Sequence, residues 1–388
     1  MDQPTASGSI IATSAKNFLI VAGEISGDHH AAPLMAALKG QNAEHTFWGL
    51  GGDLMEAEGL ETLYHARDLS VTGFIEVLKH LSFFNKVMAS VVSQCEIRKP
   101  DAAILLDYPG FNLRLGMKLK ALNIPVYYYI SPQVWAWKKG RIKTMRQFIK
   151  HIFVIFPFEE DFYKKHGIPV TFAGHPLVER DFHLPERSDF FKKHDFDENK
   201  PLVALLPGSR RNEMERHVRP LLDAINTLKQ KQPDIQFVLA GLSSLSKAYY
   251  QPFSQLENVK IIHDEPYPMM AHADVAIVAS GTATLETAYL GTPLVVIYKI
   301  APLSYLIGKL LVDIEHIAMP NLIIGERAVP ELIQSDATGH KISVEVLRLL
   351  TDLSARSQML AKLDTLKESL GHPGCAKTIS AEIQKDLD

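Results

Sequence analysis

Cysteine is scarce in this sequence, since only Cys95 and Cys375 occur among its 388 residues. Two widely separated cysteines provide neither a disulfide framework nor the paired spacing of a structural zinc site. The first 17 residues are small and polar, and they lack the basic start and apolar run of a signal peptide. We therefore expect a reducing, cytoplasmic environment and interpret residues 1–17 as a flexible extension.

Long hydrophobic runs are also missing. No window holds the roughly 18 consecutive apolar residues that a membrane-spanning helix needs. The formal net charge of −3 argues against the strongly basic surface of a general nucleic-acid binder. With 46% hydrophobic and 22% charged residues, the composition indicates a soluble globular protein that is long enough for two or three domains. Contact with a membrane surface remains open.

Two common phosphate-binding signatures are absent as well. The Walker pattern G-x-x-x-x-G-K-[S/T] does not occur, and no G-x-G-x-x-G follows the first strand candidate at 18–23. Each pattern supplies the glycines that let a backbone approach phosphate groups closely. Their absence disfavours ATP hydrolysis and dinucleotide binding.

The chain does contain a regular alternation of short apolar strands and helical segments, which is typical of parallel sheets covered on both faces. In the first half, the strand candidates are 18–23, 46–48, 102–106, 126–130, 152–155 and 170–172. After a charged stretch without a strand, the alternation restarts at Pro201, and three amphipathic helical segments end the chain. This pattern predicts two doubly wound α/β domains, which we bound at 18–182 and 201–353, with a linker at 183–200 and final helices at 354–388.

Two loops of the second domain join a strand to a helix through small residues. The loops consist of Gly208, Ser209 and Arg210 in one case and Ser280, Gly281 and Thr282 in the other. Backbone amides at a helix start, together with a forked cation, suit a diphosphate. Glu286, about one turn into the second of these helices, can accept two hydrogen bonds from a ribose diol. The alternative is structural: Ser280 or Thr282 caps the helix, Glu286 complements its dipole, and Arg210 is solvated.

A third segment of this domain, 319–334, carries amide and carboxyl side chains. The residues are Asn321, Glu331 and Gln334. Such groups recognise sugar hydroxyls and acylamino groups, so they are candidates for binding a donor sugar. An ordinary loop followed by a helix start is the alternative interpretation.

Polar residues also follow two strand candidates of the first domain. Glu24 and Ser26 come directly after the first strand, and Asp107 ends a buried strand just before a Pro-Gly turn. A carboxylate in that position can accept the proton of an attacking hydroxyl group. The alternative for Asp107 is an Asx-turn that stabilises the loop. Glu24 is harder to explain as structure, because it stands at the tip of a strand.

An aromatic and basic segment indicates contact with an anionic amphiphile. Trp135 and Trp137 are followed by Lys138, Arg141 and further cations, with no acidic residue between them. This composition suits a lipid head group or a phosphorylated sugar. The alternative is a solvated helix face.

The helical stretch 74–95 is apolar beyond one face. Its main stripe, which includes Phe74 and Leu78, is typical of a helix that faces a core. The apolar residues off this stripe are Ile75, Phe83 and Val87. The helix is therefore either buried on two sides or in contact with a membrane surface.

Together these motifs resemble the lipid-A-disaccharide synthase family. The matching stretches occur in the family's order and are AGEISGD, LLDYPGFN, YYYISPQVWAW, FAGHPL, LLPGSR, SGTATLE and PNLIIG followed by VPELIQ. They extend over most of the chain, from about Phe18 to Leu387. The resemblance implies a GT-B fold, in which two Rossmann-like domains face a cleft and the last helix crosses back to the first domain.

The resemblance also implies a reaction. An enzyme of this family transfers the sugar of UDP-2,3-diacylglucosamine to the 6-hydroxyl of 2,3-diacylglucosamine 1-phosphate (lipid X), with inversion, and gives a β(1→6) disaccharide 1-phosphate and UDP. It implies neither a metal ion nor a cofactor. We accordingly expect an enzyme that is associated peripherally with the cytoplasmic face of the inner membrane, binds no nucleic acid and forms a homodimer.

Residue roles follow from the family's motifs at the matching positions. The resemblance assigns the general base to Asp107, acceptor positioning or assistance to Glu24 and Ser26, UDP binding to Arg210 and Glu286, and the donor sugar or phosphates to Asn321 and Gln334. Two other classes remain open. One is an enzyme like UDP-N-acetylglucosamine 2-epimerase, which shares the architecture, and the other is a non-catalytic UDP-sugar-binding protein.

Overall fold

The computed structural model of the chain describes residues 14–69, 74–135, 140–301, 305 and 315–388, without the side chains of 74–81. The chain forms two compact units. The first unit extends to Glu179 and also includes His372–Asp388, and the second is Arg180–Gly371. Most of the predicted N-terminal extension, residues 1–13, lies outside the described residues.

A parallel sheet of seven strands forms the centre of the first unit, in the order β3-β2-β1-β4-β5-β6-β7. Its strands are β1 (Asn17–Ala22), β2 (Thr46–Gly51), β3 (Leu60–His65), β4 (Ala102–Leu106), β5 (Val126–Tyr129), β6 (Ile149–Val154) and β7 (Val170–Phe172). Every residue of β4 is buried, as expected for a central strand covered on both faces. Ala22 of β1 is in register with Leu106 of β4, so the loops that follow these strands start side by side.

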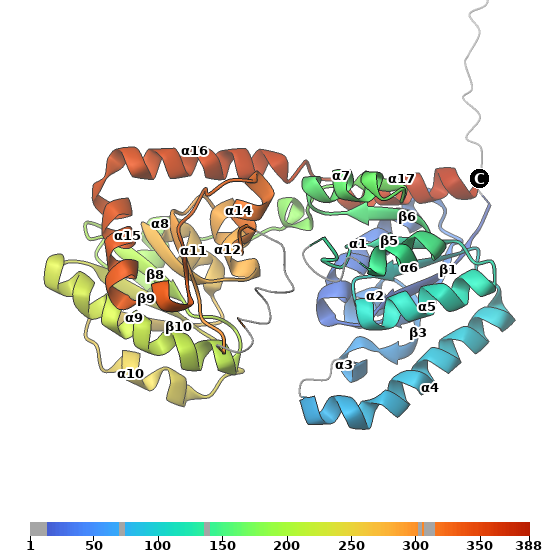
Figure 1. Ribbon diagram of the computed structural model, residues 1–388, viewed down its shortest axis with the longest axis horizontal. Helices are drawn as coiled ribbons and strands as arrows, with labels where there is room; N and C mark the ends of the chain where they lie inside the picture. The colour runs from blue at the N-terminus through green and yellow to red at the C-terminus, as the bar shows by residue number, and fades with distance from the viewer. Residues whose placement is uncertain (1–13, 70–73, 136–139, 302–304, 306–314) are drawn as a thin grey trace, which may run out of the picture. The chain divides into compact units, whose positions relative to one another are not determined.

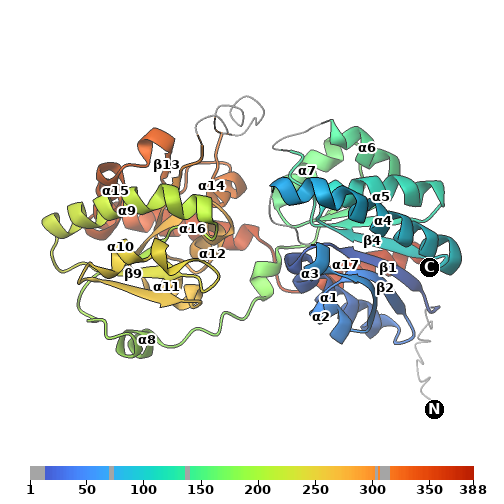
Figure 2. The same cartoon turned by 90° about the horizontal axis from the view of Figure 1, so that it is seen from below.

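Helices cover both faces of this sheet. They are α1 (Ile25–Gln41), α2 (Asp53–Ala57), α3 (Ala66–Leu69), α4 (Phe74–Arg98), α5 (Pro109–Ala121), α6 (Arg141–Phe148), α7 (Pro157–Lys165), the 3-10 turn η1 (Pro176–Glu179) and α17 (Cys375–Leu387). Figure 2 shows α4 and α5 on one side of the sheet and α1 and α17 on the other. The last helix of the chain therefore completes the first unit.

Three kinds of contact fix α17 on the first unit. Ile379 and Ile383 are fully buried. The Tyr127 hydroxyl donates to Asp386 at 2.7 Å. At the start of the helix, the Glu179 carboxylate accepts the backbone N–H groups of residues 374 and 375 at 2.7 and 2.6 Å. These contacts join the two stretches of chain at which the first unit ends and resumes.

The second unit has a parallel sheet of six strands in the order β10-β9-β8-β11-β12-β13. The strands are β8 (Leu202–Leu206), β9 (Gln236–Gly241), β10 (Val259–His263), β11 (Val275–Ala279), β12 (Leu294–Tyr298) and β13 (Glu331–Ile333). Its helical segments are α8 (Arg187–Lys193), α9 (Arg211–Lys231), η2 (Lys247–Tyr249), α10 (Gln251–Ser254), α11 (Pro266–His272), α12 (Thr282–Tyr289), α14 (Met319–Ile324), η3 (Gln334–Asp336), α15 (Gly339–Thr351) and α16 (Leu353–Ser369) (Figure 1). The predicted pair of doubly wound parallel sheets is confirmed.

The unit boundaries differ from those drawn on the sequence. The predicted linker contains α8, whose Phe190 and Phe191 are buried against the second unit. Helix α16 contacts α12, α14 and α15 of the same unit, and its Leu363 is fully buried. The second unit therefore extends from Arg180 to Gly371, and only α17 of the predicted final helices belongs to the first.

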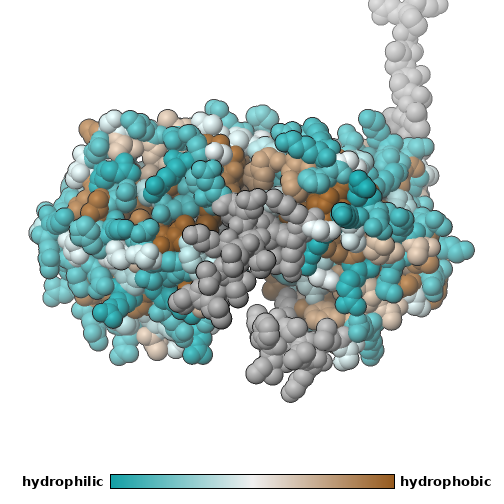
Figure 3. Space-filling model, in the orientation of Figure 1, coloured by the Kyte–Doolittle hydropathy of each residue, from teal (hydrophilic) through white to brown (hydrophobic). Residues whose placement is uncertain are grey.

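Figure 3 shows one face on which apolar residues are scattered among polar ones. Ile25, at the start of α1, is one of the exposed large apolar residues, with 59% of its surface accessible. Within the described part of the chain, no helix has the combined length and apolar character that crossing a bilayer requires.

Candidate functional site

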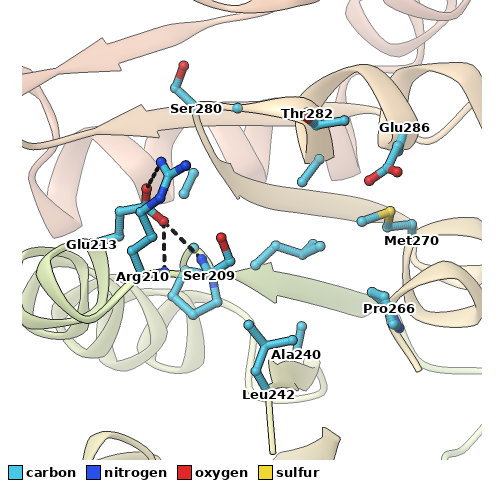
Figure 4. A pocket seen from close by; sticks show the side chains of 16 residues that line it. Ser209, Arg210, Glu213, Ala240, Leu242, Pro266, Met270, Ser280, Thr282 and Glu286 are labelled. Carbon is cyan, nitrogen blue, oxygen red and sulfur yellow. Dashed lines mark hydrogen bonds and ion pairs between the residues drawn. The ribbon is translucent and has the colours of Figure 1, made fainter. Parts of the chain in front are cut away.

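A pocket of about 340 Å³ lies at the carboxyl ends of β8, β9 and β11 in the second unit. In Figure 4, Ala240, Leu242 and Pro266 form one side of it, while Ser280 and Thr282 lie on the opposite side. The predicted residues that line the pocket are Gly208, Ser209, Arg210, Ser280, Gly281, Thr282 and Glu286. The volume is within the range of small-molecule sites, and an apolar side facing polar groups suits a base attached to phosphates.

The start of α12 supplies one polar wall of the pocket. Strand β11 ends at Ala279, Gly281 turns the chain with φ +153°, and the helix begins at Thr282 without a side-chain cap. The Ser280 hydroxyl instead donates to the carbonyl oxygen of Ile317 at 3.5 Å. The alternative that Ser280 or Thr282 caps this helix is therefore wrong. The first amides of α12 and its dipole are left to favour an anion in the pocket.

The Gly208 turn differs from this arrangement because a carboxylate of the protein already occupies it. The backbone N–H groups of Ser209 and Arg210 donate to Glu213 Oε2 at 2.9 and 3.2 Å, and the Arg210 guanidinium lies 3.4 Å from Oε1 (Figure 4). A Cβ atom at position 208 would stand 2.3 Å from Glu213 Oε2, and the φ of +118° at Gly208 also favours glycine. The turn is thus built to hold an anionic oxygen, which Glu213 provides here.

His217 holds the Gly208 turn in place through two hydrogen bonds. It is fully buried, its Nδ1–H donates to the carbonyl oxygen of Pro207 at 2.7 Å, and its Nε2 accepts the N–H of Lys299 at 3.0 Å. Burial lowers the pKa of His217, which favours the neutral tautomer that these two bonds require. The residue ties α9 to the ends of β8 and β12.

Glu286 is held by two neighbours in the second unit. Its Oε1 accepts hydrogen bonds from Arg180 Nη1 at 2.7 Å and from the Tyr267 hydroxyl at 3.1 Å. Its side chain is only 12% exposed. Burial, followed by the charge of Glu286, raises the pKa of the Tyr267 hydroxyl. Neither Arg180 nor Tyr267 was predicted from the sequence.

Asn321 and Glu331 are structural partners of each other. The Asn321 amide is fully buried, donates to Val329 O and Glu331 Oε1, and accepts the N–H groups of Ala328 and Val329. The Glu331 carboxylate also accepts the N–H groups of residues 317 and 318. Their polar atoms are used to fix the chain beside Ser280, and neither residue lines the pocket, so the predicted direct contact with a donor sugar finds no support in this geometry.

Gln334 stands at the carboxyl end of β13. It is half-buried, has a φ of +52°, and its Nε2 atom is buried without a hydrogen-bond partner. It is not among the residues that line the pocket. Within the described chain, Gln334 therefore combines a left-handed backbone with a buried donor that makes no hydrogen bond.

In the first unit, the parallel pairing of β1 and β4 brings the predicted acid residues together. Glu24 immediately precedes α1, and the Asp107 carboxyl follows β4. A Cβ atom at Gly23 would lie 2.3 Å from the Tyr108 ring, so that ring covers the glycine and spaces the two loops. Burial, followed by the charge of Glu24, raises the pKa of Asp107 to about 6. A carboxyl group with this pKa is suited to general base chemistry near neutral pH.

The backbone of Asp107 is strained and firmly held. Asp107 and Tyr108 have φ values of +41° and +45°. The carbonyl oxygen of Asp107 accepts hydrogen bonds from the Tyr128 hydroxyl and from Asn112 Nδ2, the latter at 2.9 Å. Asn112 is fully buried. The alternative of a simple Asx-turn does not account for these contacts, which hold a strained residue at a fixed position.

Ser26 and Asp28, which follow Glu24 in α1, have different environments. Ser26 is exposed in the first turn of the helix. Asp28 is buried, and its carboxylate accepts the backbone N–H groups of residues 52, 54 and 55 at 2.9 to 3.1 Å. Asp28 therefore anchors α2, whereas Ser26 stays accessible.

The structure describes part of the predicted amphiphile surface. Trp135 is half-buried, donates from Nε1 to Glu159 at 3.1 Å and packs edge-on against Phe158. Arg141 is half-buried at the start of α6. Trp137 and Lys138 lie outside the described residues.

Helix α4 shows where two of the off-stripe apolar residues point. Val87 is fully buried and Phe83 packs partly buried against the core, 6.0 Å from the Tyr64 ring centroid. These two contacts favour burial on two sides over an outward apolar face. The side chains of Phe74, Ile75 and Leu78 lie outside the described part of the chain.

Similarity to solved structures defines the class of fold. A UDP-GlcNAc 2-epimerase from Neisseria meningitidis superposes with a TM-score of 0.66 at 14% identity and covers 95% of this chain and 100% of its own. The glycotransferase of kitacinnamycin gives 0.61 at 12% identity and covers 96% and 100%. With its two parallel α/β units, the chain therefore has the GT-B fold that glycosyltransferases and such epimerases share.

The sequence relationship is more specific than the fold. Residues 18–383 match the family described as lipid-A-disaccharide synthetase. The lipid-A-disaccharide synthase of Geobacter sulfurreducens is 38% identical over 376 residues, which cover 96% of this chain and 98% of the relative. The chain belongs to the lipid-A-disaccharide synthase family, the glycosyltransferases of lipid A biosynthesis.

Proposed function

We propose that this chain transfers the sugar of UDP-2,3-diacylglucosamine to the 6-hydroxyl of 2,3-diacylglucosamine 1-phosphate, with inversion and without a metal ion. Family membership supports a UDP-sugar donor and a lipid acceptor. The observation that carries the proposal is the pocket in which the uncapped start of α12 is followed one turn later by Glu286. A nucleoside diphosphate needs this combination of amides for phosphate and a carboxylate for ribose.

The donor would bind the second unit in three parts. The uracil base would occupy the apolar side at Ala240, Leu242 and Pro266, and the ribose hydroxyls would reach Glu286. The diphosphate would lie against the amides at Gly281 and Thr282. Amides that point at the departing phosphate stabilise the charge that develops as the sugar–oxygen bond breaks. Exposed Arg210 would add a mobile cation from the opposite side.

In the first unit, Asp107 would act as the general base. Its carboxylate removes the proton of the acceptor 6-hydroxyl, whose oxygen attacks the anomeric carbon from the face opposite the diphosphate. The bond to the diphosphate breaks as the new bond forms, so the configuration inverts and UDP leaves with the bonding electrons. A general base of this kind contributes about 10²–10⁴-fold to the rate. Glu24 would tune the Asp107 pKa, and Ser26 would position the acceptor.

The chemistry of the substrates supports a location at a membrane surface. Both carry acyl chains and are held in a bilayer, so we propose that the protein works at the cytoplasmic face of the inner membrane. Exposed Ile25 beside Ser26 would offer apolar contact near the acceptor. A homodimer, which the family suggests, belongs to the same proposal and is testable by sedimentation.

The test is incubation of the purified protein with radiolabelled lipid X and UDP-2,3-diacylglucosamine. The expected result is a labelled disaccharide and an unchanged rate in the presence of chelator. The Asp107→Ala variant should bind UDP normally and lose turnover by at least about 10²-fold. Release of a 2-epimer without acceptor would support the epimerase alternative, and binding without any turnover would support a sensor. Loss of the rate on chelation would overturn the metal-free mechanism.

A further inference from the structure

We infer that Arg180 and Tyr267 position Glu286 for the ribose and thereby set the preference for UDP over 2′-deoxy-UDP. This inference rests on the proposed function, because it requires that Glu286 receive the ribose. It goes beyond that proposal by giving the nucleotide selectivity of the site to two residues outside the matched motifs and outside the lining of the pocket.

The hydrogen bonds divide the Glu286 carboxylate into an occupied and an available oxygen. Arg180 Nη1 and the Tyr267 hydroxyl both donate to Oε1. Among the described residues, no group donates a hydrogen bond to Oε2. The carboxylate lines the pocket, so Oε2 is the atom that can accept the ribose hydroxyls. A carboxylate anchored at one oxygen cannot rotate freely, which fixes the direction of the other.

The two anchors are themselves fixed. The Tyr267 hydroxyl accepts a hydrogen bond from Arg180, so its single proton is committed to Glu286. The Arg180 guanidinium lies 5.6 Å from the centroid of the Tyr267 ring, and that ring packs edge-on against Phe182 at 5.0 Å. A charge-assisted bond backed by a held hydroxyl is stronger and better defined than one made by a solvated side chain.

The second unit offers a matched arrangement away from the pocket. Glu215 Oε1 accepts Arg211 Nε at 2.8 Å and the Tyr249 hydroxyl at 3.1 Å. The same three residue types therefore meet on an exposed face of α9, and none of the three lines the pocket. Variants of this second cluster show what the loss of an Arg–Tyr–Glu cluster does to the protein when the cluster does not line the pocket.

The experiment measures the binding of UDP and of 2′-deoxy-UDP by titration calorimetry to the full chain. The variants are Tyr267→Phe and Arg180→Met, with Tyr249→Phe and Arg211→Met as controls. We expect the unaltered protein to prefer UDP by about tenfold, which is the effect of one lost hydrogen bond to a charged group. Each site variant should weaken UDP binding more than 2′-deoxy-UDP binding, which keeps one ribose hydroxyl, and so should reduce this ratio at least threefold. The control variants should stay within twofold of the unaltered protein for both nucleotides.

Three other results would contradict the inference. Equal loss for the two nucleotides would assign Arg180 and Tyr267 a merely structural role and overturn the inference. Tighter UDP binding in Arg180→Met would also overturn it, because Arg180 would then compete with the ribose. If the unaltered protein showed no preference between the nucleotides, the ribose role of Glu286 in the proposed function would fail as well. Tyr267→Phe removes a single oxygen, so it keeps the test decisive if Arg180→Met does not fold.

Discussion

At the scale of single residues, Asp107 shows how burial prepares a carboxyl group for proton transfer. Its pKa is about 6, raised by burial first and by the charge of Glu24 second. Only the ionised form accepts a proton, so kcat/KM should fall as the pH drops below about 6. Glu24→Gln removes the neighbouring charge, which should move this acid limb to lower pH. A pH profile of kcat/KM for both proteins between pH 4.5 and 8 tests this, and an unmoved limb would contradict the role of Glu24.

The same carboxyl group should reduce the stability of the fold. A folded-state pKa above the unfolded value contributes stability that is fully present below pH 3.8 and is lost as the pH rises through about 6. Asp107→Asn removes the ionisation, and asparagine tolerates the positive φ at this position. We expect the variant to be more stable by about 1–3 kcal/mol at pH 8 and no more stable at pH 3.5. Urea unfolding at the two pH values measures the difference, and equal gains at both would contradict the charge argument.

Glu213 permits a third prediction at this scale. Its carboxylate lies in the Gly208 turn, where it accepts two backbone N–H groups and faces the pocket. Glu213→Gln keeps an acceptor oxygen, removes the negative charge and releases Arg210 from its ion pair. UDP should therefore bind about three- to tenfold more tightly, as expected from removing a like charge near a partly exposed site. Calorimetric titration with UDP is the measurement, and weaker binding would show that Glu213 orients Arg210 for the ligand.

At the scale of secondary-structure elements, most of the fold could be predicted from the hydrophobic periodicity and from the residues that follow each strand. The alternation of apolar strands and helices predicts both sheets except for their edge strands β3 and β13, and the predicted loops after β8 and β11 line one pocket. Strand β3 was not predicted, because its sequence LETLYH is only partly buried at a sheet edge. Arg180 could not be predicted as a partner of Glu286, because the two residues are 106 positions apart and meet only in the folded unit. The partners of Asn321 lie within ten residues of it, but they depend on how the turn before β13 folds.

Asn321, which holds the turn between α14 and β13, allows a prediction about stability. Asn321 satisfies two buried N–H groups and two acceptors, so Asn321→Ala should reduce the free energy of unfolding by about 2–4 kcal/mol. Donor KM should change little under conditions where the variant is folded. Urea unfolding and steady-state kinetics together separate the two roles. Unchanged stability together with a raised donor KM would instead support a direct contact between Asn321 and the donor sugar.

At the scale of the whole molecule, the chain passes between its two units twice, after Glu179 and after Gly371. Composition did not reveal either crossing, because α8 and α16 have the polar surfaces of ordinary exposed helices while burying Phe190 and Leu363. Glu179 bonds to the start of α17 in the first unit, whereas the next residue, Arg180, bonds to Glu286 in the second. Adjacent residues thus serve the stability of one unit and the candidate site of the other.

Because of this division, the C-terminal helix α17 stabilises the first unit, which is built mainly from N-terminal residues. Ile379 of α17 is fully buried in the first unit, so Ile379→Ala should cost that unit about 2–4 kcal/mol. The tryptophans, at positions 48, 135 and 137, all precede Glu179, so their fluorescence reports the unfolding of the first unit. Ile379→Ala should lower the urea midpoint of the fluorescence transition. Leu363 is equally buried but belongs to the second unit. Leu363→Ala should therefore lower the urea midpoint of the transition in far-ultraviolet circular dichroism and leave the fluorescence midpoint unchanged. A common shift of both signals in both variants would mean that the two units unfold as one cooperative body.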